Sequence, residues 1–292
     1  MSDKRILILT AIIMVLAATA CCVNSCRDYH TDKLRFVGAR QSSPPKSHPL
    51  SLVVVVHGWI EKGRGDWPED MAVAIQQKVN TEIWLCGYFD WAKGAASLNP
   101  TDAVTYAADI AGPALAEQIL ALDADLQHIH FIAHSSGCWA ASAAAKILAK
   151  KTGTNIHLTF LDAYVPHNWQ ENSLGDIDMD AGKKYWADHY YTRDYTLDWT
   201  QYDLTFAHNV DVTDIDQGIK DHNFPWQWYY ATITGKYPIG HFLDNRKLLW
   251  DADGTAYGFA RSKEALDGNN WSLTLQLPIG NKAVIINKKT PH

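Results

Sequence analysis

The sequence predicts an α/β fold in which a mostly parallel central sheet carries helices on both of its faces. Along most of the 292 residues, β-prone segments alternate with helix-prone segments, a rhythm that is typical of parallel sheets. Residues 51–56 form a continuous apolar run rich in valine, as expected of a strand that is buried on both faces. Since domains of this class often reach about 250 residues undivided, the length favours one large domain.

The predicted elements follow one another in a regular order. Besides 51–56, strands are predicted over residues 84–91, 128–133, 155–161, 189–192 and 209–213. Helices are predicted over 69–79, 101–122 and 138–150, and Gly112-Pro113 should kink or split the second of them. Residues 271–277 and 283–286 flank the turn Pro-Ile-Gly-Asn and predict a C-terminal hairpin, which could join the sheet edge or stand apart.

A serine pair occupies the junction between the strand 128–133 and the helix that follows it, where the chain reads Ala-His-Ser-Ser-Gly. In a tight strand–turn–helix junction, the residues two before and two after an exposed serine must be small. Ala133 and Gly137 meet this requirement for Ser135. Ser136 would instead be flanked by a histidine and a cysteine, so Ser135 is the candidate nucleophile. Taken alone, the segment could also be a chance serine turn before a helix.

A second motif precedes this junction, because the strand 51–56 ends at His57-Gly58-Trp59 and Gly58 permits a sharp turn. With the two motifs in this order, the chain resembles the α/β-hydrolase superfamily, in particular the pancreatic-lipase-like branch and its bacterial lipase and esterase relatives. The resemblance implies the α/β-hydrolase fold. It also implies that the backbone amides of Trp59 and Ser136 form the oxyanion hole.

A serine hydroxyl needs a histidine base that is held by a carboxylate, and in this fold the chain order is serine, acid, histidine. Asp162 follows the strand 155–161, where the lipase-like branch has its acid, and it is the candidate acid. Asp194, after the next strand, is the alternative, because many other α/β-hydrolases have their acid there.

The candidate base is His222, which opens the aromatic-rich segment His-Asn-Phe-Pro-Trp-Gln-Trp-Tyr-Tyr. Related lipases carry their catalytic histidine on a loop just before such a helix, and Pro225 suits the first turn of a helix. His241 is the alternative. His57 and His134 belong to the two motifs, but they precede the acid in the chain.

Composition excludes several other classes of function. The net charge is −6 and the chain has no basic cluster, so nucleic acid is not an expected partner. The five cysteines show no metal-ligand spacing, and buried free thiols are expected at Cys86 and Cys138. Asp176, Asp178 and Asp180 lack the glycine and glutamate of a calcium loop. We therefore expect no metal and no cofactor.

The N-terminus predicts export from the cytoplasm. Lys4-Arg5 precede an apolar run, and small residues lead to Cys21, so residues 1–20 are predicted to be a signal peptide. The favoured form is a cell-envelope lipoprotein that is acylated on Cys21 and attached to the membrane; a cleaved periplasmic or secreted protein and an uncleaved anchor are the alternatives. A polar tether is predicted over 21–48, and the α/β-hydrolase domain over 49–292.

These features together predict a serine hydrolase that cleaves carboxylic esters, including lipids, through an acyl-enzyme intermediate. An acyltransferase would use the same residues. A non-catalytic envelope binding protein that kept the fold is the third reading, although such a protein has no need of a serine, an acid and a histidine together.

Overall fold

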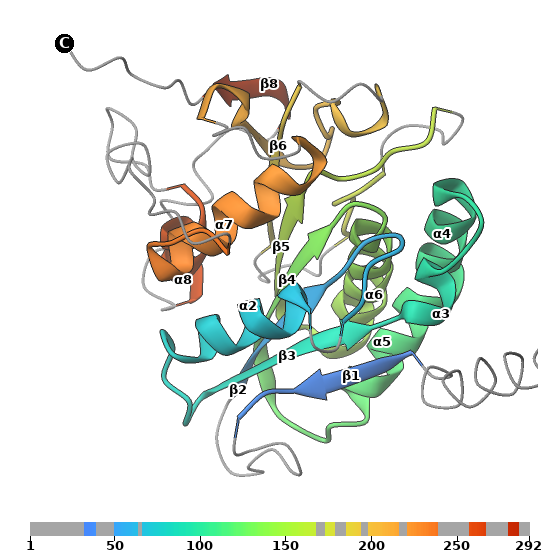
Figure 1. Cartoon of the computed structure of the whole chain (residues 1–292). Coiled ribbons are helices and arrows are strands. Elements are labelled where there is room, and N and C mark those ends of the chain that lie inside the picture. The colour runs from blue at the N-terminus through green and yellow to red at the C-terminus, as the bar shows by residue number, and fades with distance from the viewer. Residues whose placement is uncertain are drawn as a thin grey trace, which may run out of the picture.

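The computed structural model describes residues 32–38, 50–63, 66–167, 173–178, 185–193, 198–215, 221–238, 257–266 and 280–285. Within these residues, eight strands form one sheet in the order β1-β3-β2-β4-β5-β6-β7-β8 (Figure 1). The edge strand β1 (Lys33–Phe36) is antiparallel to β3 (Trp84–Asp90), and the remaining neighbours pair in parallel. The predicted α/β class with a mostly parallel sheet is confirmed.

The parallel strands overlap the predicted segments, although the strand predicted over 189–192 extends from Tyr185 to Tyr191. They are β2 (Leu50–Val56), β4 (Leu126–His134), β5 (Asn155–Leu161), β6 (Tyr185–Tyr191), β7 (His208–Asp211) and β8 (Gly280–Ile285). β2 lies between β3 and β4 near the middle of the sheet, and its five consecutive residues from Leu52 to Val56 are fully buried. Burial on both faces explains why this strand has no polar alternation.

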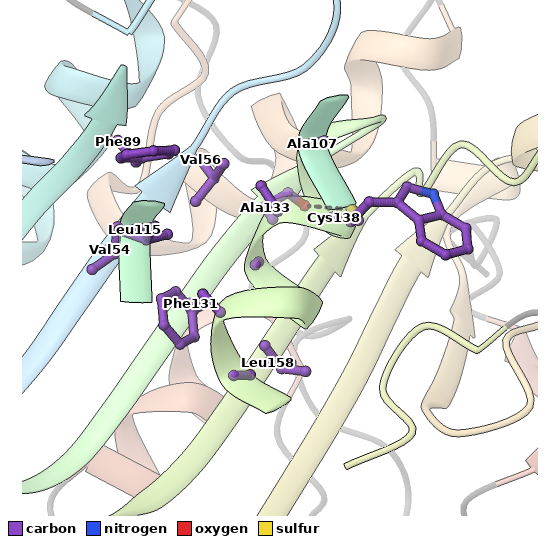
Figure 2. Close-up of a cluster of buried hydrophobic side chains, with 14 of the residues drawn as sticks. Val54, Val56, Phe89, Ala107, Leu115, Phe131, Ala133, Cys138 and Leu158 are labelled. Atoms are coloured by element: carbon purple, nitrogen blue, oxygen red, sulfur yellow. Dashed lines mark hydrogen bonds between the residues drawn. The ribbon is translucent and has the colours of Figure 1, made fainter. Parts of the chain in front are cut away.

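Helices cover the two faces of the sheet, and successive side chains of β2 point to opposite faces. Val54 and Val56 join the core beneath α5 (Gly112–Leu120) and α6 (Gly137–Thr152), together with Phe131, as Figure 2 shows. Val53 and Val55 join the other core, beneath α2 (Trp67–Gln76) and α7 (Phe224–Thr234). The two helix layers are separated by the sheet in Figure 1.

The long helix predicted over 101–122 is interrupted, as its Gly-Pro pair predicts. α4 (Pro100–Tyr106) passes into a π-helical segment, Ala107–Ala111, before α5 begins at Gly112. The amide of Gly112 donates to the carbonyl of Ala107, five residues back. Pro113 has no N–H to donate and its ring crowds the preceding turn, so a wider turn accommodates it. Gly112 also lets α6 approach closely, since a Cβ there would lie 2.6 Å from the Cβ of Ala143.

The N-terminal boundary of the domain differs from the prediction. The sequence predicts a tether over 21–48, but Lys33–Phe36 forms the edge strand β1, so this part of the segment belongs to the sheet. Lys33–Phe36 alternates polar and apolar residues, but four residues are too few to give a strong strand signal, and pairing with β3 stabilises them as a strand. Residues 1–31, which include the predicted signal peptide and Cys21, lie outside the described residues, as do 39–49.

The C-terminal part adds a last strand to the sheet. β8 contains most of the second arm of the predicted hairpin and pairs in parallel with β7, whereas the first arm, 271–277, lies outside the described residues. α8 (Phe259–Leu266) packs beside α7 (Figure 1). Among the helices that the structure describes, none is long and apolar enough to cross a membrane.

Short elements complete the carboxyl edge of the sheet, where the predicted site residues gather. They are α3 (Ala92–Ala95) and 3-10 turns at Asp198–Thr200, Thr213–Ile215 and Asp221–Asn223. Cys86 in β3 and Cys138 in α6 are free and buried, as predicted.

Candidate active site

The three predicted catalytic side chains lie together at the carboxyl ends of the parallel strands. Ser135 directly follows β4, and Asp162 directly follows β5. These strands are neighbours, and His134 pairs with Leu161 at their ends, so the two side chains emerge side by side. His222 lies on the short turn before α7.

Ser135 occupies a strained turn between β4 and α6. Its φ is +54°, in the left-handed region that a serine seldom adopts. The turn is held because the amide of Ser135 donates to the carbonyl of Leu161 at 3.0 Å, and the carbonyl of Ser135 accepts from the amide of Cys138 at 3.2 Å. A strained serine of this kind is characteristic of a nucleophile elbow, in which the turn exposes the hydroxyl above the sheet.

Two hydrogen bonds connect the side chains of Asp162, His222 and Ser135 in series. The Nε2 of His222 lies 2.9 Å from the Oγ of Ser135, and its Nδ1 lies 2.7 Å from the Oδ2 of Asp162. The other carboxylate oxygen of Asp162 accepts from the amide of Thr192 at 3.0 Å. Because a carboxylate only accepts, Nδ1 carries the proton, and Nε2 is free to accept the serine hydroxyl proton.

The acid is shielded from solvent, whereas the histidine is partly accessible. The side chain of Asp162 is fully buried, whereas that of His222 is 25% exposed. Ser135 is 5% exposed, at the floor of an open depression. The alternatives Asp194 and His241 both lie outside the described residues.

The predicted oxyanion amides belong to the residue after Ser135 and to the turn that packs against Ser135. Gly58 packs directly against the serine, since a Cβ on Gly58 would lie 2.8 Å from the Cβ of Ser135. The adjacent Trp59 is anchored by its indole Nε1, which donates to the carbonyl of Ser97 at 2.9 Å. Within the described part of the chain, neither the amide of Trp59 nor that of Ser136 donates to a protein group. Both donors are therefore available to an oxygen atom bound beside Ser135.

The comparison with protein families decides the affiliation of the chain. The family model described as Lipase matches residues 32–181, more than half of the 292 residues. The chain belongs to the lipase family. A comparison with curated proteins found no match.

This membership makes the protein a lipase-like hydrolase of ester substrates. The match begins at residue 32, next to β1, and includes Trp59, Ser135 and Asp162. It ends before His222, so the relation of His222 to the other two side chains comes from the tertiary structure alone.

A cavity of about 280 Å³ opens beside Ser135 and His222 in this lipase. Its walls are largely aromatic or aliphatic, as expected of a pocket that receives an apolar group. The lining residues are Trp59, Ile60, Glu61, Pro100, Ser135, Tyr164, Trp199, Thr200, His222 and Asn223. Sequence reasoning did not identify Tyr164 or Trp199, because they belong to loops without a periodic signal. Their rings meet edge to face, with centroids 5.5 Å apart.

His57 supports the turn Gly58-Trp59, which carries one of the two predicted oxyanion amides and is named the oxyanion turn for that reason. Its Nδ1 donates to the carbonyl of Gly58 at 3.0 Å, and its Nε2 accepts from the amide of Trp91 at 3.1 Å. Burial lowers the pKa of His57, more than the carboxylates around it raise that pKa. A neutral His57 thus fixes the turn, and it is too enclosed to act on a substrate.

No metal site accompanies these groups in the described part of the chain, where no cluster of three or more His, Cys, Asp or Glu side chains could hold an ion. Asp176 and Asp178 are described, but Asp180 lies outside the described residues.

Proposed function

We propose that this lipase-family protein cleaves carboxylic esters through an acyl-enzyme intermediate, with Ser135 as nucleophile, His222 as general base and Asp162 as its carboxylate partner. The observation that carries the proposal is the continuous chain of hydrogen bonds from Asp162 through His222 to Ser135, at 2.7 and 2.9 Å. A binding protein would gain nothing from a strained serine aligned in this way.

The proposed reaction has two halves. In the first, the Oγ of Ser135 attacks the ester carbonyl carbon while the Nε2 of His222 takes the hydroxyl proton. The carbonyl oxygen becomes an oxyanion and accepts hydrogen bonds from the amides of Trp59 and Ser136. When the intermediate collapses, His222 returns the proton to the departing alcohol and Ser135 keeps the acyl group.

In the second half, water replaces the alcohol. His222 removes a proton from the water molecule, which attacks the acyl carbon, and the second oxyanion is bound by the same two amides. Collapse releases the carboxylic acid and returns the proton to Ser135. No step requires a metal ion or a cofactor.

The cavity suggests the size of the acyl group. A volume of about 280 Å³ is just below the range for small-molecule pockets, roughly 300–1,000 Å³. We propose that an acyl chain of short to medium length lies against Trp59, Tyr164 and Trp199, where its apolar surface is removed from water.

A series of p-nitrophenyl esters tests both parts of the proposal. We expect kcat/KM to rise with acyl length while the cavity fills and to fall once the chain exceeds it. A fluorophosphonate probe should label the wild-type protein on Ser135 and leave Ser135→Ala unlabelled. Absence of labelling together with absence of hydrolysis would reject the proposed enzyme. Product analysis with an added alcohol distinguishes acyl transfer from hydrolysis.

We also propose that the protein is exported and attached to the envelope through an acylated Cys21. The support is the basic pair Lys4-Arg5 followed by an apolar run that ends in small residues before the cysteine.

A further inference from the structure

His134, the residue before the serine, is bonded through both of its ring nitrogens. Its Nδ1 lies 3.0 Å from the Oε1 of Glu61, and its Nε2 lies 2.9 Å from the main-chain carbonyl oxygen of His222. The main-chain carbonyl only accepts, and so does the Glu61 carboxylate when it is ionised. With Glu61 ionised, both ring nitrogens carry protons when the two hydrogen bonds form together, and His134 is a positively charged imidazolium.

The surroundings of His134 favour that charge. Burial lowers the pKa of His134, but the charge of Glu61 and the two hydrogen bonds raise it, and the resulting pKa lies above the ordinary value of 6.5. Burial raises the pKa of Glu61, whereas the charge and hydrogen bond of His134 lower it, and the pKa settles at about 2. The other groups that face His134 are the ring of His222, Asp162 and the edge of Trp67.

The ion pair between Glu61 and His134 connects three segments that form the site. Glu61 also accepts the amide of Gly58 at 2.5 Å, which ties it to the oxyanion turn. His134 belongs to the end of β4 and directly precedes the nucleophile. The bond to His222 extends the connection to the turn that carries the proposed base.

The hydrogen bond from His134 to the carbonyl of His222 restrains the main chain of His222 rather than its ring. The hydrogen bonds of His222 to Ser135 and Asp162 orient the imidazole. They do not fix the position of the His222 backbone relative to the sheet, which depends on other contacts. The ring of His134 also contacts that of His222, with centroids 4.6 Å apart and the ring planes tilted by 38°. A shift of about 1 Å in such a group can lower a rate by about a hundredfold.

We propose that His134 is a positioning residue for His222, and that Glu61 keeps His134 doubly protonated so that it can hold the His222 carbonyl. This inference rests on the proposed function of the triad. Neither side chain need touch the substrate's reacting atoms for the effect.

Two substitutions of His134 separate positioning from a purely structural role. In His134→Gln, the amide nitrogen can replace Nε2 and still donate to the His222 carbonyl, but the contact with Glu61 is lost. In His134→Asn, the amide nitrogen can replace Nδ1 and still donate to Glu61, but the His222 carbonyl loses its donor. Positioning predicts that His134→Gln is the more active variant, whereas retention of the Glu61 contact predicts that His134→Asn is the more stable.

The measurements are kcat and KM with a p-nitrophenyl ester, together with Tm. We expect kcat of His134→Asn to fall on the order of 10–100-fold with little change in KM, because the cavity walls do not include His134. We expect His134→Gln to keep most of its kcat despite a lower Tm. Equal kcat values, or a lower kcat in His134→Gln, would overturn the proposal.

His157 provides a matched control. It is a fully buried histidine whose Nε2 lies 3.6 Å from the Oδ2 of Asp188, and it lies near the other end of β5, away from Ser135. His157→Asn and His157→Gln should lower Tm and leave kcat unchanged. If either variant reduced kcat as much as His134→Asn does, a general loss of fold stability would explain the lower kcat, and the positioning role would be rejected.

Two further variants keep the outcomes distinct. Ser135→Ala and His222→Ala are assayed in parallel, and full turnover in both would reject the proposed function itself. If both are inactive while the two His134 variants have equal kcat, only the positioning role fails. Should His134→Asn not fold, the same comparison is made in the Glu61→Gln background, where no buried carboxylate loses a cationic partner, and the same ranking of kcat decides.

Discussion

The carbonyl oxygen of His57 lies so close to Gly137 that a Cβ atom on residue 137 would be 2.1 Å from it. This contact joins the end of β2 to the start of α6, and therefore joins the oxyanion turn to the nucleophile turn. On the other side of the same turn, Gly58 packs against Ser135. The two motifs that are far apart in the sequence interlock through two glycines.

Gly137→Ala should damage both stability and activity. The obstructing atoms belong to the backbone of His57 and cannot rotate away, so helix α6 or the oxyanion turn must move. Overpacking of this kind costs about 1–3 kcal/mol or more, which chemical denaturation should reveal. In Gly58→Ala, the nearest atom to the new Cβ is the Cβ of Ser135 at 2.8 Å, a less severe clash than 2.1 Å, so this variant should retain more stability while losing activity. A stable and fully active Gly137→Ala would contradict the interlock.

Ser135→Ala should lower kcat by on the order of a million-fold, because members of a triad act as a unit. Ser136→Ala should cause a far smaller loss, since its proposed contribution is a backbone amide that alanine retains. Its hydroxyl oxygen is buried and has no hydrogen-bond partner within the described residues, so little stability depends on it. Ester hydrolysis by both variants checks this, and an inactive Ser136→Ala with an active Ser135→Ala would shift the nucleophile by one residue.

His222→Ala should abolish the acylation burst and leave the fold intact, because the residue lies on a short turn and its side chain is partly exposed. His241→Ala should keep most of the burst. Stopped-flow release of p-nitrophenol measures both. A normal burst in His222→Ala, with none in His241→Ala, would assign the base to the later residue.

The stability of the protein should fall as the pH is lowered below about 6.5. Burial lowers the pKa of His157 to about 3 and that of His189 to about 4, from an ordinary value of 6.5. Between pH 6.5 and about 4, the unfolded chain therefore binds protons at these two histidines that the folded protein does not bind. Their contribution to the free energy of unfolding is complete above pH 6.5 and declines toward pH 4. Urea unfolding across this range measures the decline, which should be shallower in His157→Gln; a flat profile would contradict it.

Mass spectrometry of the mature protein should find Cys21 at the N-terminus, with the mass of attached acyl chains. The prediction follows from the basic pair, the apolar run and the small residues before the cysteine. Cys21→Ala should abolish the acyl mass and release the protein from the envelope fraction. A mature protein that begins at Met1 in the cytosol would exclude export.

The sequence by itself predicted most strands of the sheet and the serine turn. Continuous valine-rich runs are informative because a strand covered on both faces needs apolar side chains at every position, and β2 has them. The candidate nucleophile could be identified for a steric reason, since of the two adjacent serines only Ser135 has small residues at both critical positions. Chain order and the resemblance then favoured Asp162 and His222.

Contacts between distant residues were decided only by the tertiary structure. Lys33–Phe36 forms a strand because β3 is available to pair with it, and the walls of the cavity come from loops that meet only in the folded chain. The role of Glu61 depends on His134, which is 73 residues away, and that of His134 depends on the carbonyl of His222, which is 88 residues away. Local patterns record how a residue packs against its neighbours along one element, whereas an ion pair between a strand end and a distant loop leaves no periodic pattern in the sequence.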